Sequence, residues 1–276
     1  MRIHGKEKLK HNIIASCSKQ KTLKDLVTAK ENAQQSDRLA SAFLNNISHE
    51  IRTPTNGILG FTDLLKEPKR NNARQKKYIG IIEKSGLRML NIINDIIDLS
   101  KIEAGMMELD ITESDINQQL DYIYTFFKPE VEAKGMKLFF KNPSPAKKVI
   151  VKTDREKLFA ILSNLLKNAI RYSDEGVIEI GYEINSGEIE FFVKDTGIGI
   201  PKEKQEVIFE RFIQADIEDK AARQGSGLGL AISSSYIDML GGKIWVESKE
   251  GVGSKFFFIL PYNSDSITAI KNNFRK

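Results

Sequence analysis

The chain has very little cysteine and histidine: its 276 residues include one cysteine, Cys17, and three histidines. A single cysteine excludes a disulfide within the chain, disfavours a cysteine-ligated zinc site and points to a reducing compartment. No apolar run approaches the roughly 20 residues that cross a bilayer, and no signal peptide precedes residue 40. We therefore expect this stretch of chain to make no membrane contact and to lie in the cytoplasm. Because it begins directly in a lysine-rich segment, we expect a longer protein, whose own membrane attachment stays open.

The net charge of +5 is concentrated near the N-terminus. Residues 1–36 carry 8 Lys or Arg against 3 Asp or Glu, so the totals of 42 and 37 leave 34 of each sign for the rest of the chain. A basic leader with no aromatic residue to stack on bases is typical of a solvated linker helix rather than of a nucleic-acid arm. We expect no nucleic-acid partner.

Residues 23–103 are predicted to form two long helices joined by a loop at residues 66–72, which contains Pro68. The first helix carries one apolar stripe, and the second carries a heptad seam with spacings of four and three. The seam consists of Tyr78, Ile82, Ser85, Met89, Ile92, Ile96 and Leu99. Further apolar residues at positions 81, 90, 93 and 97 make this surface wider than one partner can cover. We therefore prefer a dimeric four-helix bundle of two antiparallel hairpins to one hairpin packed on the following domain.

His49 lies in the first of these helices, in the run SHEIRTP at residues 48–54. It is two positions, or about 200°, from both Ile47 and Ile51 of the apolar stripe, so we expect its imidazole to face solvent. The alternative is an ordinary surface histidine. Pro54 favours a function, because a proline inside a helix costs about 3 kcal/mol and indicates a bend that is kept for a purpose.

After residue 107 the pattern changes to alternating helices and strands, which predicts an α/β sandwich ending near residue 262. Helices are expected at residues 115–134 and 155–172, the second opened by the capping-box order TDRE at residues 153–156. Strands are expected at residues 136–141, 149–152, 177–184, 189–194, 243–247 and 255–260. The turn at residues 185–187 has the composition of a hairpin.

Short segments of this second domain have the chemistry of a nucleotide site. In residues 164–172, Asn164 and Asn168 share a helix face with Arg171, where amide oxygens can bind Mg²⁺ and a guanidinium can neutralise phosphate. Asp195 follows an apolar strand in DTGIGIP and can accept a hydrogen bond from an exocyclic amine, as on adenine. The run FERF at residues 209–212 supplies two aromatic side chains that can hold a mobile segment down.

The glycine-rich run GSGLGL at residues 225–230 opens a helix, whose free amides and dipole favour a phosphate. It is not a Walker loop, because no Lys-Ser or Lys-Thr follows. Neither does it open a Rossmann unit, because the polar stretch 215–224 stands where a strand should lead in. Each of these segments is common in proteins by itself.

In this order and spacing, behind a hairpin that bears a histidine, the segments resemble the transmitter core of sensor histidine kinases. The resemblance covers residues 37–262. It implies a linker helix from an upstream sensor region at 1–36, a dimerisation and histidine-phosphotransfer domain at 37–106, a Bergerat-type ATP-binding domain at 107–263 and a polar tail at 264–276. Residues 48–54 match the H box, 164–172 the N box, 195–199 the G1 box, 209–212 the F box and 225–229 the G2 box, and residues 213–224 would form the ATP lid.

The resemblance further implies ATP- and Mg²⁺-dependent autophosphorylation of His49, with Glu50 as the general base. The phosphoryl group would pass to an aspartate of a response-regulator receiver domain outside this chain, and Thr53 would support dephosphorylation of that regulator. The implied nucleotide-binding residues are Asn164, Asn168, Arg171, Tyr172, Asp195, Gly197, Gly199, Arg211, Gln224, Gly225, Gly227, Leu228 and Gly229, of which Asn168 and Gln224 would also bind the metal.

Two other classes of function stay open. One is a catalytically inactive, nucleotide-binding dimeric scaffold, and the other is a Bergerat-type ATPase that releases free phosphate and does not need His49. The input signal, the cognate regulator, and the choice between phosphorylation within a subunit and across the dimer do not follow from the sequence.

Overall fold

The computed structural model describes residues 47–66, 72–141, 148–185, 187–210 and 227–262, together with residues 30 and 45. Apart from residue 30, the predicted linker helix at 1–36 lies outside the described residues, as does the polar tail at 264–276. Two compact units divide between Thr53 and Pro54. Within the described ranges, no helix is both long and apolar enough to traverse a lipid bilayer.

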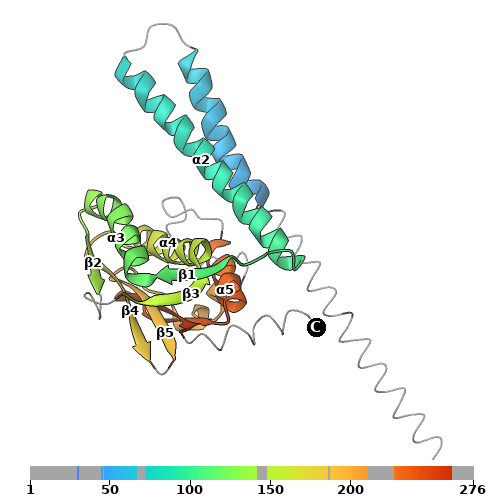
Figure 1. Cartoon of the computed structure of the whole chain (residues 1–276). Helices are drawn as coiled ribbons and strands as arrows, with labels where there is room; N and C mark the ends of the chain where they lie inside the picture. Colours follow the sequence, from blue (N-terminus) through green and yellow to red (C-terminus); the bar gives the residue numbers. More distant parts are fainter. Residues whose placement is uncertain are drawn as a thin grey trace, which may run out of the picture. The chain divides into compact units, whose positions relative to one another are not determined.

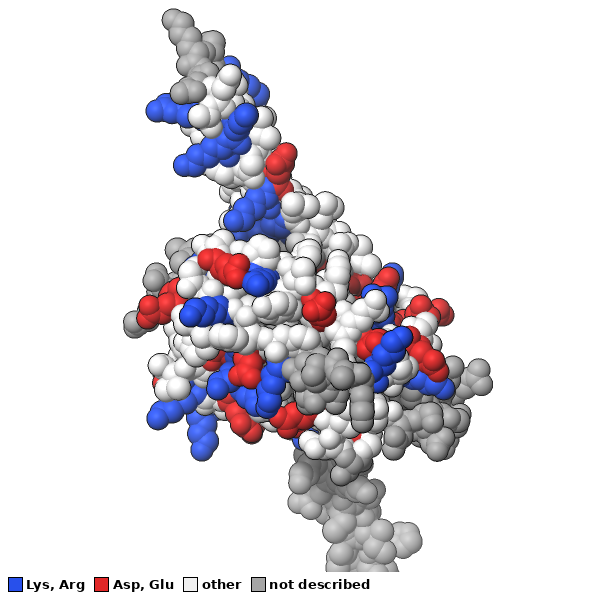
Figure 2. All heavy atoms as spheres, turned by 60° about the vertical axis from the view of Figure 1, so that its left-hand side comes forward, with Lys and Arg blue, Asp and Glu red and all other residues white. Residues whose placement is uncertain are grey.

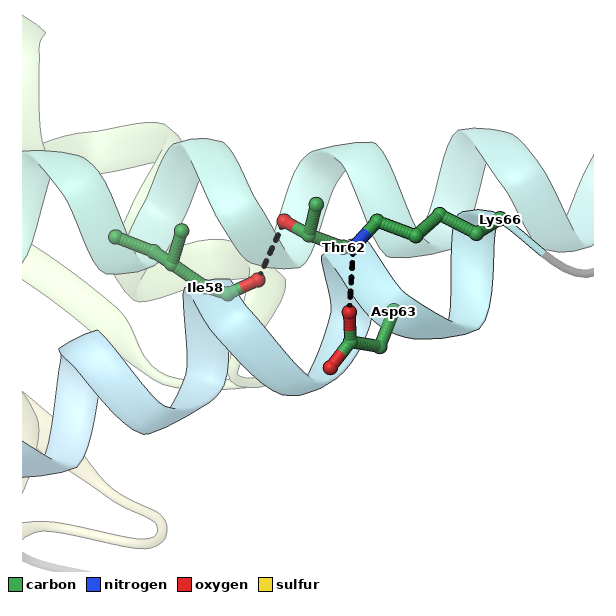
Figure 3. A network of polar contacts seen from close by, with 4 residues as sticks. All are labelled: Ile58, Thr62, Asp63 and Lys66. Carbon is green, nitrogen blue, oxygen red and sulfur yellow. Dashed lines mark hydrogen bonds and ion pairs between the residues drawn. The ribbon is translucent and has the colours of Figure 1, made fainter.

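The first helix runs through residues 47–65 and continues on both sides of Pro54. Hydroxyl side chains bond back to its own backbone: Thr53 Oγ1 donates to the carbonyl oxygen of His49 at 3.2 Å, and Thr62 Oγ1 donates to that of Ile58 at 2.6 Å. Lys66 Nζ pairs with Asp63 Oδ1 at 2.8 Å near the helix end (Figure 3). Such an exposed pair contributes little to stability because solvent screens it, so the helix depends on packing of its apolar stripe.

Helix α2 (Asn72–Glu103) packs antiparallel against residues 54–66 of the first helix (Figure 1). The rings of Phe61 and Tyr78 lie 5.3 Å apart, and a Cβ added to Gly57 would come within 3.1 Å of Ser85 Oγ. The predicted heptad seam is its buried side, where Ile92 and Leu99 are only 4% and 3% exposed. Of the predicted second apolar surface, Leu90, Ile93 and Ile97 are exposed and Ile81 is partly exposed, and Leu87 adds a further exposed apolar side chain.

The second domain is a mixed α/β sheet domain. Its elements follow in the order β1 (Ile111–Asp115), α3 (Ile116–Ala133), β2 (Lys137–Lys141), β3 (Ile150–Asp154), α4 (Arg155–Tyr172), β4 (Val177–Asn185), β5 (Glu188–Asp195), α5 (Gly229–Met239), β6 (Lys243–Lys249) and β7 (Gly253–Pro261). A five-stranded sheet has the order β2-β4-β5-β7-β6, in which only β2 and β4 are parallel, and β1 pairs with β3 in a separate antiparallel ribbon. Helices α3, α4 and α5 lie together on one side of the larger sheet (Figure 1).

The core lies between this helix layer and the sheet. On β5 the buried residues Ile189, Phe191 and Val193 share one face, and the same period of two carries Asp195 onto that face at the strand end; Phe192 is buried on the other face. Each fully buried side chain of this size contributes about 1.5–3 kcal/mol relative to an exposed one. The apolar pattern of β5 therefore fixes the direction of a buried carboxylate.

On the face that Figure 2 presents, positive and negative side chains are interspersed over the α/β domain.

The structure corrects two sequence expectations. Strand β1 was not anticipated, because only Ser114 of its five residues is buried and it exists through pairing with β3. The capping-box interpretation at residues 153–156 is wrong: Asp154, not Thr153, is the N-cap of α4, and its Oδ1 accepts from the backbone N–H of Lys157 at 3.0 Å. Thr153 is instead held in the β3 ladder opposite Thr112.

Candidate nucleotide site and phosphoacceptor histidine

Helix α4 presents the two predicted asparagines on one half-buried face. Asn164 Nδ2 donates to Ser233 Oγ of α5 at 3.0 Å. The side chains of Asn168 and Arg171 form no hydrogen bond with any residue in the described ranges, although both are only partly exposed. Two polar groups with spare bonding capacity beside a packed helix face are suited to a polar ligand, because amide oxygens bind Mg²⁺ and a guanidinium binds phosphate.

The start of α5 lies directly against Asn164. A Cβ added to Gly229, the first residue of α5, would lie 2.2 Å from Asn164 Oδ1, so no other residue fits there without displacement. Gly227 just before it has a φ of +68°, which favours glycine. The side chain of the N-cap residue of α5, Leu228, makes no capping hydrogen bond. The helix dipole and the first-turn amides make this end attractive to an anion such as a phosphate.

Asp195 lies at the end of β5 and is only 6% exposed. Its Oδ1 accepts hydrogen bonds from the backbone N–H of Gly197 at 2.9 Å and from that of Ser254 at 3.3 Å. Burial raises the pKa of this carboxyl above the ordinary value, although both hydrogen bonds oppose the rise. In the part of the chain that the structure describes, nothing donates to Oδ2. This oxygen can therefore accept a hydrogen bond from an exocyclic amine.

The loop after Asp195 is clamped between α4 and the β6–β7 turn. The backbone N–H of Ile198 donates to the carbonyl of Tyr172 at 3.1 Å, and that of Gly251 donates to the carbonyl of Ile198 at 2.7 Å. A Cβ on Gly197 would lie 2.2 Å from the carbonyl oxygen of Tyr172. Gly199 has a φ of +70°, and a Cβ added to it would lie 2.1 Å from the carbonyl oxygen of Lys249. Both glycines are thus required by close backbone approach.

These contacts give the site two ends along one helix. Gly197, whose N–H donates to Asp195, meets α4 at Tyr172, whereas Gly229 meets it at Asn164. Eight residues of helix span about 12 Å, with Asn168 between the ends. The structure thus brings a carboxylate suited to a base amine and a helix N-terminus suited to phosphates to opposite ends of a row of amides.

Other predicted site residues are placed only in part. Arg211, Gln224 and Gly225 lie outside the described residues, as does the predicted lid. Phe209, in the short turn η2 (Val207–Phe209), packs edge-to-face on Phe256 with ring centroids 6.3 Å apart.

Sequence reasoning missed Ser254, whose backbone donates to Asp195, and Ser173. The Ser173 side chain is fully buried behind Gly197, and its hydroxyl has no hydrogen-bond partner in the ranges described. The glycine-rich turn before Ser254 was a signal for a close approach, but its target lies 59 residues away. Ser173 gave no signal, because a serine after a helix is common.

His49 is exposed in the first helix, as the apolar stripe predicts. Glu50, the next residue, is 9% exposed. Thr53 lies one turn further, and its hydroxyl donates to the backbone of His49. The exposed imidazole is available to a reaction partner from solvent.

Two family models match the chain. Residues 39–105 match the His Kinase A (phospho-acceptor) domain, and residues 153–264 match the family of histidine kinase-, DNA gyrase B- and HSP90-like ATPases. The first contains His49, and the second contains the α4, Asp195 and α5 segments of the candidate site. Each part of the fold thus contains a match, and residues 106–152 lie between the two.

The sequence is also similar to curated proteins. It is 40% identical over 244 residues to the sensor histidine kinase GacS of Pseudomonas protegens, covering 86% of this chain and 26% of GacS. It is 35% identical over 265 residues to the signal transduction histidine-protein kinase BarA of Escherichia coli, covering 91% of this chain and 29% of BarA. The chain thus spans about a quarter of the length of these relatives.

Solved structures show the same architecture. Full-length ShkA in complex with AMPPNP superposes with a TM-score of 0.61 at 30% identity, over 79% of this chain and 45% of ShkA. Histidine kinase ThkA in complex with the response regulator protein TrrA superposes with a TM-score of 0.63 at 28% identity, over 86% of this chain and 67% of that one. This chain is a transmitter core of the sensor histidine kinase family, and its second domain has the Bergerat ATP-binding fold.

Proposed function

We propose that this chain is an ATP-dependent protein-histidine kinase that phosphorylates His49 and passes the phosphoryl group to an aspartate of a response regulator. The observation that carries the proposal is the two-ended site along α4, with the open oxygen of Asp195 at one end and the start of α5 at the other. An exposed histidine in a matched phosphoacceptor domain supplies the nucleophile. We place the reaction in the cytoplasm, where ATP is available.

In this proposal Asp195 accepts a hydrogen bond from the adenine amine. Guanine is disfavoured because it would leave Oδ2 of this buried carboxylate without a donor. Asn164, held by Ser233, supports the α4–α5 junction, and Arg171, Gln224 and the backbone of residues 225–229 hold phosphates. The residues present fit a divalent cation, since the amide oxygen of Asn168 is unengaged within the described chain. Mg²⁺ bound by Asn168 and Gln224 would neutralise charge on the phosphates.

The chemical step needs one free imidazole nitrogen on His49. That nitrogen attacks the γ-phosphorus in line, the bond from phosphorus to the β,γ-bridging oxygen breaks, and ADP leaves. The proton on the other ring nitrogen passes to Glu50, which acts as general base. Positioning of the reactants supplies most of the acceleration, because phosphoryl transfer needs little covalent participation by the protein.

A second copy of the chain is the proposed partner of α2. The exposed side chains of Leu87, Leu90, Ile93 and Ile97 recur at three- and four-residue spacings, which is the geometry of a helix bundle seam. The match to a His Kinase A domain and the ThkA complex with TrrA support a homodimer that meets a receiver domain.

Labelled ATP tests the proposed activity. Wild-type protein with Mg²⁺ should incorporate acid-labile, alkali-stable label from γ-labelled ATP, as phosphohistidine does. His49→Gln should abolish it, while the matched substitution His11→Gln in the basic leader should not. Label retained in His49→Gln would reject the proposal. Steady release of free phosphate that persists in His49→Gln would favour an ATPase instead.

Thr53 is the proposed determinant of regulator dephosphorylation, where its side chain would place the attacking water. Its hydroxyl hydrogen bonds the backbone of His49, which leaves the oxygen lone pairs to orient a water. Thr53→Ala should preserve autophosphorylation and slow dephosphorylation of a phosphorylated regulator by roughly 100-fold or more, the lower end of the range for loss of a positioned proton-transfer group. Equal loss of both activities would show that the substitution only damages the helix.

A further inference from the structure

The loop that carries Gly197 and Gly199 is held by polar side chains outside the motifs named above. We propose that Ser248 and Gln205 are positioning residues that hold residues 196–200 in the conformation in which Asp195 meets the nucleotide base. The inference rests on the proposed binding of ATP at Asp195. If it holds, β6 and the turn after Pro201 contribute to base recognition by positioning the loop.

Ser248 is the centre of the network. Its Oγ accepts from the backbone N–H of Ile200 at 2.8 Å and lies 2.9 Å from both the carbonyl of Gly253 and the Oγ of Ser254. A hydroxyl has one proton, so Ser248 donates to one of these two oxygens. When it donates to Gly253, the hydroxyl of Ser254 can donate to it in return. A single side chain thereby joins the end of the loop to the start of β7.

The start of β7 in turn contacts Asp195. The backbone N–H of Ser254 donates to Asp195 Oδ1, and a Cβ on Gly253 would lie 2.2 Å from the carbonyl oxygen of Asp195. Ser248 therefore joins Ile200, at the end of the loop that begins with Asp195, to the Gly253–Ser254 backbone, which contacts Asp195 directly. A shift of either point would move the carboxylate relative to a bound base.

Gln205 secures the same loop from the other side. It follows the short turn η1 (Lys202–Lys204), and its Nε2 donates to the carbonyl oxygens of Ile200 and Ser248, both at 2.9 Å. Both amide protons are used on backbone acceptors, so the position requires a donor. A carboxylate of the same shape would face two carbonyl oxygens without a proton to share.

A merely structural role and a positioning role predict different results. If the network only stabilises the domain, its loss lowers the melting temperature without a selective effect on nucleotide binding. If it positions Asp195, the affinity for ATP falls and discrimination against GTP weakens. The phosphorylation rate at saturating ATP should then be kept, since the histidine and the phosphate-binding end of the site are untouched.

The test is calorimetric titration with a non-hydrolysable ATP analogue and Mg²⁺, alongside thermal unfolding and the rate at saturating ATP. Ser248→Ala should raise the Kd roughly tenfold, which corresponds to about 1.4 kcal/mol. Ser248→Thr keeps the hydroxyl and should restore affinity to within about threefold of wild type, a difference of less than 1 kcal/mol. A wild-type Kd in Ser248→Ala would overturn the inference, whether or not the melting temperature of the variant is lowered.

Gln205 provides an independent pair of variants should Ser248→Ala fail to fold. Gln205→Glu should weaken binding at pH 7 more than Gln205→Leu, because it reverses the polarity of two hydrogen bonds. Part of the loss should be recovered on acidification, where the carboxyl regains a proton. Lys202→Gln, an exposed neighbour with the same change in net charge, should bind as wild type does. Equal affinities in the two Gln205 variants would refute the role of the donor, whereas wild-type protein that does not bind ATP would refute the proposed function itself.

Discussion

Replacing Asp195 with asparagine separates the recognition of the base from the stability of the domain. The amide has the same shape, and its oxygen can still accept from Gly197 and Ser254 as Oδ1 does. The NH₂ group then stands where Oδ2 was, and a donor faces the donor of an adenine amine. Asp195→Asn should therefore leave the fold intact and selectively impair ATP binding.

The magnitude follows from the hydrogen bond that is lost. A hydrogen bond to a charged group contributes about 1.5–3 kcal/mol, which corresponds to a loss of roughly 10- to 150-fold in affinity. Titration with a non-hydrolysable ATP analogue measures it directly. An affinity within about twofold of wild type would refute the assignment of Oδ2 to the base, since that corresponds to less than 0.5 kcal/mol.

Stability should change in the opposite direction. Burial raises the folded-state pKa of Asp195 above the ordinary value of 3.8. The contribution of this carboxyl to stability is therefore fully present below the ordinary pKa and is lost as pH rises through the raised one. At pH 7 the wild type carries a buried charge that Asp195→Asn lacks, so the variant should melt at the same temperature or higher. This advantage should shrink toward pH 4, and a variant that melts well below wild type at pH 7 would contradict the account.

Three further substitutions test the packing. Gly229→Ala should lower both stability, by about 1–3 kcal/mol, and ATP affinity, because the new Cβ would lie 2.2 Å from Asn164 Oδ1. Gly80→Ala in α2 meets nothing within 4 Å and should instead stabilise the protein by up to about 1 kcal/mol; a loss of stability would show that this helix surface is packed. Tyr236→Phe removes a 2.8 Å hydrogen bond to Asp98 Oδ2 and should cost about 1 kcal/mol, or roughly 2–4 °C in melting temperature. An unchanged melting curve would mean that this bond exchanges freely with water.

Periodic features were predictable from the sequence. The heptad seam predicted which side of α2 is buried. The apolar pattern of residues 189–194 predicted strand β5, with Asp195 at its end. Strand β1 was not predictable, because the sequence ITESD has no apolar alternation and becomes a strand only through a partner about 40 residues away. The N-cap of α4 is Asp154 for a related reason: Asp154 pairs with Ile111 in the β1–β3 ladder and stays extended, so the helix begins only at Arg155.

The sequence by itself determined which residue types are available: an outward-facing histidine in a long helix, asparagines one turn apart, an aspartate after an apolar strand and glycines before a helix. Only the tertiary structure decided which atoms meet, including the placement of Gly229 against Asn164 and the two amides that bind one oxygen of Asp195 while leaving the other open. The physical reason is that helix and strand periodicity is a local property of the chain. Hydrogen bonds between remote backbone groups depend instead on sheet register and on how closely two elements approach, which no local pattern contains.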